Sequence, residues 1–355
     1  MTKPGPGWLY GLVAAALLAA ALHLAEPVLA PIAFALFTLA LVWPVQRRLQ
    51  ARLPAFIALP VTMLVTLVAL AGLALAAGWG FSRAARWIIA NAGMLQAFYA
   101  QKLAWLEGFG IAADMLGEPF ETRRLVWLAQ AVLLQLQGVV SFLGVMLVFV
   151  ILGLLEVTVA ARQLEALGET RPAAAAVLRG LRRGAAKLRA YMLVRTVMSV
   201  LTGLAIWGFA AATGLDLALE WGVIAFVLNY IPFIGSLLAT LLPTVFAVLQ
   251  FGTWQAALTT FLALQAIQFL SGSTIEPRLA GARLSVSPFM VLAAVFLGAF
   301  LWGIPGAFIG VPALIQALTL CEEFEGSRWV ARLLSGRDAA PAPSLHAAGP
   351  HGASE

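Results

Sequence analysis

The longest uncharged stretch of the sequence, Trp221–Ile275, is the feature that most restricts how this chain can fold. A helix that crosses the hydrocarbon core of a bilayer needs about 20 apolar residues, so this stretch is long enough for more than one crossing. The apolar runs are rich in Ala and Leu and lack the alternating segments of about ten residues that mark membrane β-barrels, so the sequence predicts an all-α polytopic membrane protein. The other runs that approach or exceed one crossing are Trp8–Ala25, Pro27–Val45, Ile57–Gly80, Gly138–Leu155, Thr196–Leu215 and Leu284–Cys321.

The composition agrees with lipid as the solvent of much of the chain. Hydrophobic residues make up 62% of the sequence and charged residues 11%, whereas about a quarter of a soluble globular chain is charged. Cys321 is the only cysteine, which excludes an intramolecular disulfide and a cysteine-based metal site. We find no Gly-rich phosphate loop ending in Lys, no Ser/His/Asp grouping and no HExxH helix. We therefore expect no enzyme, and neither a cofactor nor a metal site.

The net charge of +6 is concentrated in one segment of the chain. The positive-inside rule predicts such an excess for a cytoplasmic connection between spans, so we expect a basic cytoplasmic loop at residues 160–190 and no nucleic-acid partner. Over residues 160–195 the acids Glu165 and Glu169 are outnumbered by Arg162, Arg171, Arg179, Arg182, Arg183, Lys187, Arg189 and Arg195.

The remaining charges suggest how the chain is organised. Residues 1–80 are predicted to form three transmembrane helices, because the first run is longer than the core of a cleaved signal, about 7–15 residues. Residues 81–137 are nearly neutral and carry apolar residues at helical spacing, which favours an extracytoplasmic amphipathic segment. Residues 138–335 form the predicted C-terminal membrane domain, and the Pro/Ala-rich tail 336–355 is expected to be disordered. Both termini then lie in the cytoplasm.

Two apolar runs, Leu217–Leu249 and Pro288–Leu320, are interrupted at their centres, by NYIPFIG in the first and WGIPGAFIGVP in the second. As one helix each run would be about 45 Å long, against a hydrocarbon core of about 30 Å. Each is either a kinked single span or a re-entrant helical hairpin, whose interrupted backbone persists at membrane depth only within protein or beside a wet cavity. The hairpin alternative places Arg278 and Arg283 in the cytoplasm, as the positive-inside rule prefers.

Three stretches in order, LNYIPFIGSLLATLLP, IEPRLAGARLSVSPFMVL and LWGIPGAFIGVPALI, resemble signature segments of the autoinducer-2 exporter-like family of bacterial permeases. The resemblance is densest over residues 150–320 and departs at Gly235-Ser236, where family members often carry Gly-Pro. It implies a bacterial inner-membrane protein with about eight membrane segments of spanning or re-entrant length, which forms homo-oligomers, pentamers among them. It also implies export of the quorum-sensing signal autoinducer-2 or, for some members, sodium–proton exchange.

We therefore predict a transporter for a small polar solute, with autoinducer-2 among the candidates and the pathway at the broken helices. A sodium/proton antiporter and a non-transporting membrane scaffold remain open as alternatives. The residues expected on the pathway are Asn229, Pro232, Gly235, Glu276, Arg278, Gly303, Pro305, Gly306, Gly310 and Pro312.

The chemistry of these side chains is the reason for choosing them. Asn229 offers both a donor and an acceptor, the glycines permit close approach, and each proline leaves carbonyls upstream of it unpaired. Glu276 and Arg278 form either a gate or ion pair at one mouth of the pathway, or a helix end at the lipid head groups. Glu156 is expected to meet Arg162 or the basic loop, and is the leading acid if transport is proton-coupled.

Overall fold

The computed structural model of the protein describes residues 7–94, 96–97, 100–101, 122–276, 278 and 286–334. Regular structure in these residues is helical, which confirms the predicted all-α class. Seven of the described helical stretches are long and apolar enough to cross a membrane. The helices are α1 (Gly7–Leu24), α2 (Glu26–Gln50), α3 (Ala55–Ala90), α5 (Thr122–Thr170), α6 (Pro172–Thr213), α7 (Ala218–Leu228), α8 (Ile234–Phe251), α9 (Trp254–Leu270), the π-helix η2 (Ser271–Ile275), α11 (Pro288–Glu323) and α12 (Arg328–Leu334).

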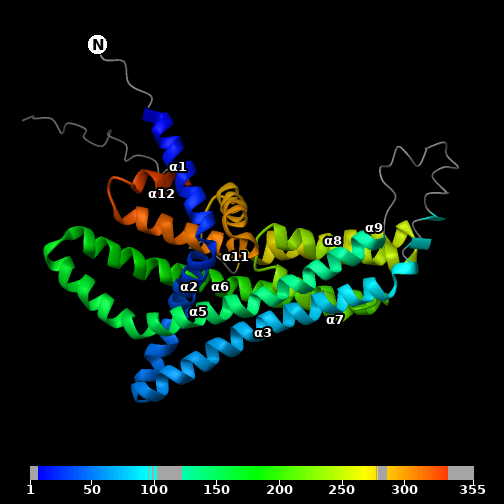
Figure 1. Cartoon of the computed structure of the whole chain (residues 1–355), viewed down its shortest axis with the longest axis horizontal. Helices are drawn as coiled ribbons and strands as arrows, with labels where there is room; N and C mark the ends of the chain where they lie inside the picture. The colour runs from blue at the N-terminus through cyan, green and yellow to red at the C-terminus, as the bar shows by residue number, and fades with distance from the viewer. Residues whose placement is uncertain are drawn as a thin grey trace, which may run out of the picture.

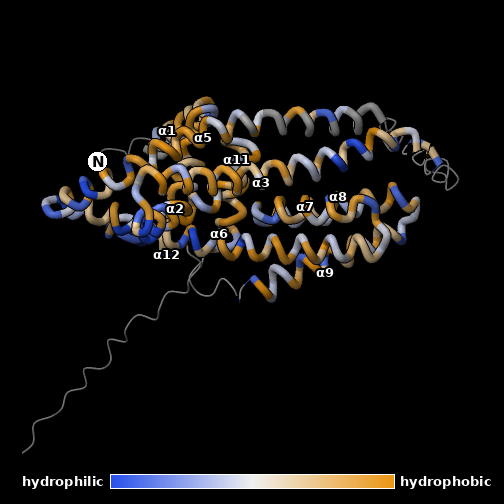
Figure 2. The backbone as a smooth tube through the Cα atoms, turned by 90° about the horizontal axis from the view of Figure 1, so that it is seen from below, coloured by the Kyte–Doolittle hydropathy of each residue, from blue (hydrophilic) through white to orange (hydrophobic). Residues whose placement is uncertain are grey.

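Three long helices, α3, α5 and α6, run side by side along the long axis of the molecule (Figure 1). With 49 and 42 residues, α5 and α6 are about 70 and 60 Å long, roughly twice the hydrocarbon core of a bilayer. They therefore project beyond any membrane that the apolar middle of the bundle occupies. The end where they meet is coloured hydrophilic in Figure 2, whereas the middle of the bundle is mostly hydrophobic.

The basic segment at 160–190 is helical, where the sequence analysis expected a loop. Helix α5 continues to Thr170 and α6 begins at Pro172, with only Arg171 between them. Ala, Leu, Glu and Arg dominate this segment and are strong helix formers, and proline is favoured at the first position of a helix. Parts of the expected outer segment are likewise continuations of α3 and α5, whereas residues 102–121, Arg283 and the tail 336–355 lie outside the described residues.

Ion pairs join this basic end to the C-terminal end of α11. Arg179 Nε lies 3.0 Å from Glu323 Oε2, Arg183 contacts the other oxygen of the same carboxylate, and Lys187 Nζ lies 2.9 Å from Glu322. The side chain of Glu323 is only 6% exposed, so two arginines compensate an almost buried charge. These ion pairs fix the N-terminal part of α6 to the C-terminal end of α11.

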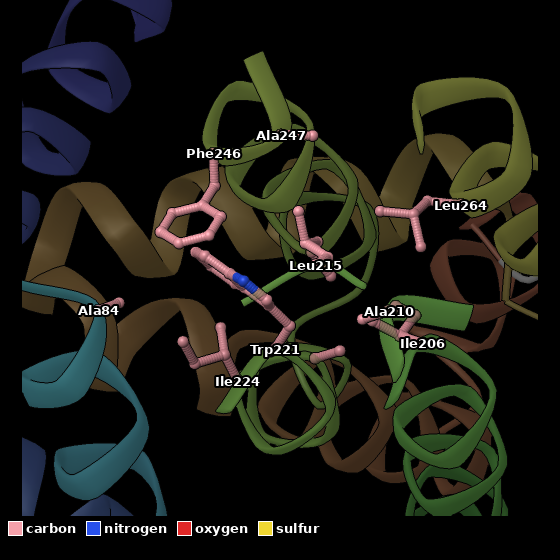
Figure 3. Packing of buried hydrophobic residues seen from close by; sticks show 11 residues of the cluster. Ala84, Ile206, Ala210, Leu215, Trp221, Ile224, Phe246, Ala247 and Leu264 are labelled. Carbon is pink, nitrogen blue, oxygen red and sulfur yellow. The ribbon is translucent and has the colours of Figure 1, made fainter. Parts of the chain in front are cut away.

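The first interrupted run is a helical hairpin, formed by α7 and α8 and here called hairpin 1. At its open end Gln250 accepts a hydrogen bond from the backbone N–H of Asp216, at 2.8 Å, and donates to the carbonyl of Gly214, at 2.9 Å. Further along, the rings of Trp221 and Phe246 pack edge to face with centroids 5.1 Å apart (Figure 3). The start of α7 therefore lies beside the end of α8, and the chain reverses between the two helices, at residues 229–233.

The second interrupted run, α11, also folds back on itself and is here called hairpin 2. Trp302 and Gly303 have non-helical backbone angles, with φ +59° at Gly303, a value that favours glycine. A Cβ atom on Gly298 would overlap the carbonyl of Gly306, and one on Gly310 would overlap the carbonyl of Ala294. Residues this far apart in sequence touch only when the arms are antiparallel. Both runs therefore fold back as helical hairpins, and neither is a kinked single helix.

The tip of hairpin 2 is held by the end of α1. Pro305 lacks an N–H, which leaves the carbonyl of Leu301 without its helical partner. His23 Nδ1 donates to that carbonyl at 2.8 Å, and Trp302 Nε1 donates to the carbonyl of Leu22 at 2.9 Å. The carbonyl that the sequence analysis expected to be free is thus already bonded.

A similar replacement of a missing helical hydrogen bond by a side chain joins α2 to α6. Pro44 removes the donor that the carbonyl of Ala40 would have within α2. Arg189 Nη1 replaces it, donating to the Ala40 oxygen at 2.9 Å. An arginine of the basic segment is therefore used to satisfy a broken helix, as interrupted backbone in apolar surroundings requires.

Candidate functional site

A cavity of about 540 Å³ lies between α6, the tip of hairpin 1, the end of α9 with η2, and hairpin 2. Arg195 and Glu276 are the charged residues among the described residues that line it. Its polar but uncharged walls come from hairpin 1 and the end of α9, whereas hairpin 2 contributes apolar side chains. The lining residues are Tyr191, Val194, Arg195, Met198, Asn229, Pro232, Phe233, Ser236, Gln268, Ser271, Gly272, Ser273, Glu276, Val286, Pro288, Val291, Val311 and Ile315.

One face of α6 forms the wall that carries Arg195. Tyr191, Val194, Arg195 and Met198 are spaced as i, i+3, i+4 and i+7, which places their side chains along one stripe of a helix. The guanidinium carbon of Arg195 lies 5.5 Å from the centre of the Tyr191 ring, within the range of a cation–π contact. This stripe thus presents a positive charge that is stabilised by the neighbouring aromatic ring.

The tip of hairpin 1 forms another wall with an unusual turn. Phe233 has φ +62° and ψ −57°, and the N–H of Ile234 donates to the carbonyl of Pro232 at 2.7 Å. These values describe a γ-turn of the rare form in which the central residue has a positive φ. Non-glycine residues in this region are strained, and such strain concentrates at functional sites. The tight reversal brings Asn229, Pro232, Phe233 and Ser236 to the cavity.

The end of α9 widens into the π-helix η2 where it meets the cavity. Ser271, Gly272 and Ser273 of this element line the cavity, and Thr202 of α6 donates a hydrogen bond to Ser271 Oγ at 3.4 Å. A Cβ atom added at Gly272 would have no atom within 4 Å. Single π-turns within helices occur frequently at functional sites, because the extra residue changes the direction of the side chains that follow. Here Glu276 comes directly after the π-helix.

Glu276 forms an ion pair with Arg195 across the cavity wall. Arg195 Nη2 lies 3.1 Å from Glu276 Oε1, with the arginine side chain 13% exposed and the glutamate side chain 32% exposed. Arg195 Nε and Gln268 Nε2 are buried and have no hydrogen-bond partner among the described residues. Buried donors are usually satisfied, so these two are exceptions beside the cavity, where neighbouring protein atoms cover both of them.

Three of the residues expected on the pathway meet at this cavity: Asn229, Pro232 and Glu276. Gly235 lies between the two arms of hairpin 1 instead, where a Cβ atom would overlap the carbonyl of Leu228. Arg278 is exposed, and no ion pair between it and Glu276 is found in the described part of the chain. The acid that the sequence paired with Arg278 is therefore bound to Arg195.

The expected residues of the second break do not line the cavity. Gly303 is exposed at the tip of hairpin 2, next to the contacts with α1. Gly306 and Gly310 lie between the two arms of the hairpin, where they allow the helices to touch. Hairpin 2 reaches the cavity through other residues of its arms, and the ones in α11 are Pro288, Val291, Val311 and Ile315. Pro305 and Pro312 are likewise outside the lining residues.

The expected contact of Glu156 with Arg162 is absent from the described residues. The two residues lie six positions apart on the continuous helix α5, which points their side chains to different sides. Glu156 is exposed and makes no ion pair in the described part of the chain. The expectation was wrong because it assumed that a loop follows residue 160.

Sequence reasoning missed Arg195 as a site residue because it was counted with the basic segment. The signal was available, since Arg195 follows Tyr191–Val194 and so already lies within the apolar part of α6. The hydroxyl-rich SGST at 271–274, directly before Glu276, was a second unused signal. A further missed pair is Arg83 with Glu220, 3.0 Å apart, which joins α3 to hairpin 1.

Comparison with known proteins identifies the group to which this arrangement belongs. Residues 12–326 match the family described as AI-2E family transporter. The chain belongs to the AI-2E transporter family. Among its relatives is the AI-2 transport protein TqsA of Escherichia coli K12, 27% identical over 317 residues, which cover 88% of this chain and 91% of TqsA. A transport protein of Haemophilus influenzae is 26% identical over 325 residues, covering 89% of this chain and 92% of that protein.

Other AI-2E family members match over a shorter length. The transport protein YhhT of Escherichia coli K12 is 30% identical over 155 residues, 44% of each chain. The relatives are named as transport proteins. Together with the seven helices of spanning length among the described residues, this makes the protein a polytopic α-helical membrane transporter of the AI-2E family.

Proposed function

We propose that this AI-2E family member carries a small polar solute through the cavity between α6, hairpin 1, η2 and hairpin 2. Autoinducer-2 is the first candidate, because the relative TqsA is named an AI-2 transport protein. The observation that carries the proposal is the meeting of polar side chains and the Arg195–Glu276 pair at the broken tip of hairpin 1 and the π-helix η2. Interrupted helices of this kind are where many transporters bind their substrates.

The cavity is suited to a small, hydrogen-bonding molecule. Its volume of about 540 Å³ falls within the range of about 300–1,000 Å³ that is usual for ligand pockets. Asn229, Gln268, Ser271 and Ser273 offer neutral donors and acceptors. The solute binds among them while Pro232 and its neighbours close one side.

Apart from Pro232, the glycines and prolines of the breaks shape the pathway and lie outside the cavity lining. Gly235 and Gly306 let the arms of their hairpins approach closely. Gly303 forms the turn of hairpin 2, and Pro305 leaves a carbonyl by which α1 holds it. During transport, we expect hairpin 1 to move relative to α6. The strained turn at its tip is the element that changes conformation.

The protein is proposed to lie in the bacterial inner membrane as a homo-oligomer, with a pentamer as the expected assembly. The positive-inside rule places the basic end of α5 and α6 in the cytoplasm, and with it both termini and Arg278. Labelling of an Arg278→Cys variant in a Cys321→Ser background with an impermeant thiol reagent tests this orientation. Reaction from the cytoplasmic side is expected, and reaction only from the outside contradicts it.

Transport by purified protein in liposomes tests the function. We expect labelled autoinducer-2 to cross the membrane without a sodium-driven change of internal pH. The change Asn229→Ala is expected to lower the flux, because it removes a donor and an acceptor from the cavity wall. A pH change in a sodium gradient without solute flux would identify an antiporter. The absence of both activities would identify a non-transporting scaffold.

A further inference from the structure

We infer that the Arg195–Glu276 pair sets the charge selectivity of the cavity, admitting neutral and zwitterionic solutes and rejecting small ions. The two side chains are the charged residues of the described lining, and they neutralise each other at 3.1 Å. Because the inference places this pair on the solute pathway, it rests on the proposed function. The rest of the described lining is neutral, so within it the pair determines the net charge that a solute meets.

A paired arginine and glutamate can still bind a neutral solute. The side chain of Glu276 is 32% exposed, and its carboxylate has further lone pairs that accept hydrogen bonds from hydroxyl groups. The guanidinium of Arg195 carries five N–H donors, and its side chain is 13% exposed in the cavity lining, so it can donate to a solute oxygen as well as to Glu276. Hydrogen bonds to charged groups are stronger than those between neutral groups. A molecule with adjacent donor and acceptor groups can therefore use both residues without separating them.

An ion has no such compensation in this cavity. Removing an ion from water costs several kcal/mol even in real protein interiors, and an opposite charge must repay this cost. An anion could obtain it from Arg195 only by displacing Glu276, which would leave the carboxylate facing a charge of its own sign. A cation could be compensated by Glu276 only by displacing Arg195, whose positive charge would then face the cation. The pair thus repels both classes of ion although its net charge is zero.

Removing one member of the pair should make the cavity permeable to small ions, and the charge that remains on the wall should decide the sign of the ions admitted. Glu276→Gln leaves a positive charge on the wall and should admit small anions. Arg195→Gln leaves a negative charge and should admit small cations. The double variant restores a neutral wall and should reject both. A merely structural role of the pair would not produce leaks of opposite sign in the two single variants.

The experiment measures ion permeability of the full chain in liposomes, using formate and potassium as the probes. We expect Glu276→Gln to raise formate permeability about tenfold or more, since an unbalanced charge at contact distance changes ion binding by more than the free energy of a tenfold change. Arg195→Gln should raise potassium permeability similarly, and the double variant should match the wild type. Arg83→Gln, which breaks the Arg83–Glu220 pair away from the cavity, is the matched control and should not leak.

A second version of the test avoids variants that fold poorly. Glu276→Cys in the Cys321→Ser background can be modified after reconstitution with thiol reagents of either charge. A sulfonate reagent should suppress formate permeability, and a trimethylammonium reagent should increase it. Single variants as tight as the wild type, or leaks that do not depend on the sign of the charge, would overturn the inference. Charge-selective leaks in a protein that carries no autoinducer-2 would support it while contradicting the proposed substrate.

Discussion

The guanidinium of Arg195 on α6 lies 3.1 Å from the carboxylate of Glu276, which directly follows the π-helix η2. This contact joins a long continuous helix to one of the interrupted elements at the wall of the cavity. The arginine is the more buried partner, with 13% of its side chain exposed. The carboxylate therefore compensates the positive charge of a mostly buried arginine, and loss of the pair should destabilise this part of the fold.

Removal of the carboxylate should destabilise the protein. In Glu276→Gln the charge of Arg195 loses its compensation, and we expect a loss of about 1–3 kcal/mol, the usual cost of a buried group without its partner. The unfolding temperature in detergent measures this effect. Glu165→Gln is the control, because its pair with Arg182 is exposed and such pairs contribute roughly 0–1 kcal/mol. Equal shifts in the two variants would show that the Arg195–Glu276 pair behaves as a surface pair.

A larger side chain at Gly272 should block transport without damage to the fold. Gly272 lines the cavity and a Cβ atom there meets no atom within 4 Å, so Gly272→Leu adds a large side chain at the cavity wall without overlap. We expect the flux of labelled autoinducer-2 in liposomes to fall at least about tenfold, with little change in unfolding temperature. Gly208→Leu is the matched control, since Gly208 also has free space but lies outside the cavity lining. Undiminished flux in Gly272→Leu would place the solute pathway elsewhere.

A methyl group at Gly235 should disturb hairpin 1. A Cβ atom there overlaps the carbonyl of Leu228 in the facing arm, and backbone atoms cannot move away without shifting the helix. We expect Gly235→Ala to lower stability by about 1–3 kcal/mol, as overpacking of close-packed sites does. The unfolding temperature of Gly272→Ala gives the comparison, and it should remain close to that of the wild type. A tolerated Gly235→Ala would mean that the arms of hairpin 1 can separate freely.

Loss of the hydrogen bond from Trp302 to α1 should loosen the tip of hairpin 2. Trp302→Phe keeps an aromatic ring but removes the donor to the Leu22 carbonyl. We expect a cost of about 1 kcal/mol and faster amide hydrogen exchange around residues 300–304. Trp329→Phe serves as the control, because Trp329 is exposed on α12 and far from this contact in sequence. Unchanged exchange at the tip would show that α1 does not hold it.

Much of the fold could be predicted because interruptions and charges are local features of the sequence. Pro232 and Gly235 marked the turn of hairpin 1, and Pro305 with its neighbouring glycines marked that of hairpin 2. Proline removes a donor and glycine permits close approach whatever surrounds them. The helical form of the basic segment was missed, although its Ala- and Leu-rich composition favoured a helix.

The candidate site could be predicted only in part. Asn229, Pro232 and Glu276 were recognised from their position beside the breaks, and the structure brings them to one cavity. Arg195 was assigned to the cytoplasmic segment, so the partner of Glu276 was taken to be Arg278. Proximity in sequence favoured that choice, but on a helix the direction of each side chain decides which charges can meet.

The sequence by itself determined that this chain is helical, lies in lipid, is broken at two places and belongs to a transporter family. Only the tertiary structure decided that the tip of hairpin 1 lies at the cavity while the tip of hairpin 2 contacts α1. The physical reason is that helices such as α7 and α9 do not gather their polar residues on one face, so the sequence pattern does not fix their rotation. Which side faces the cavity then depends on packing against neighbours, including the contact of Arg195 with Glu276.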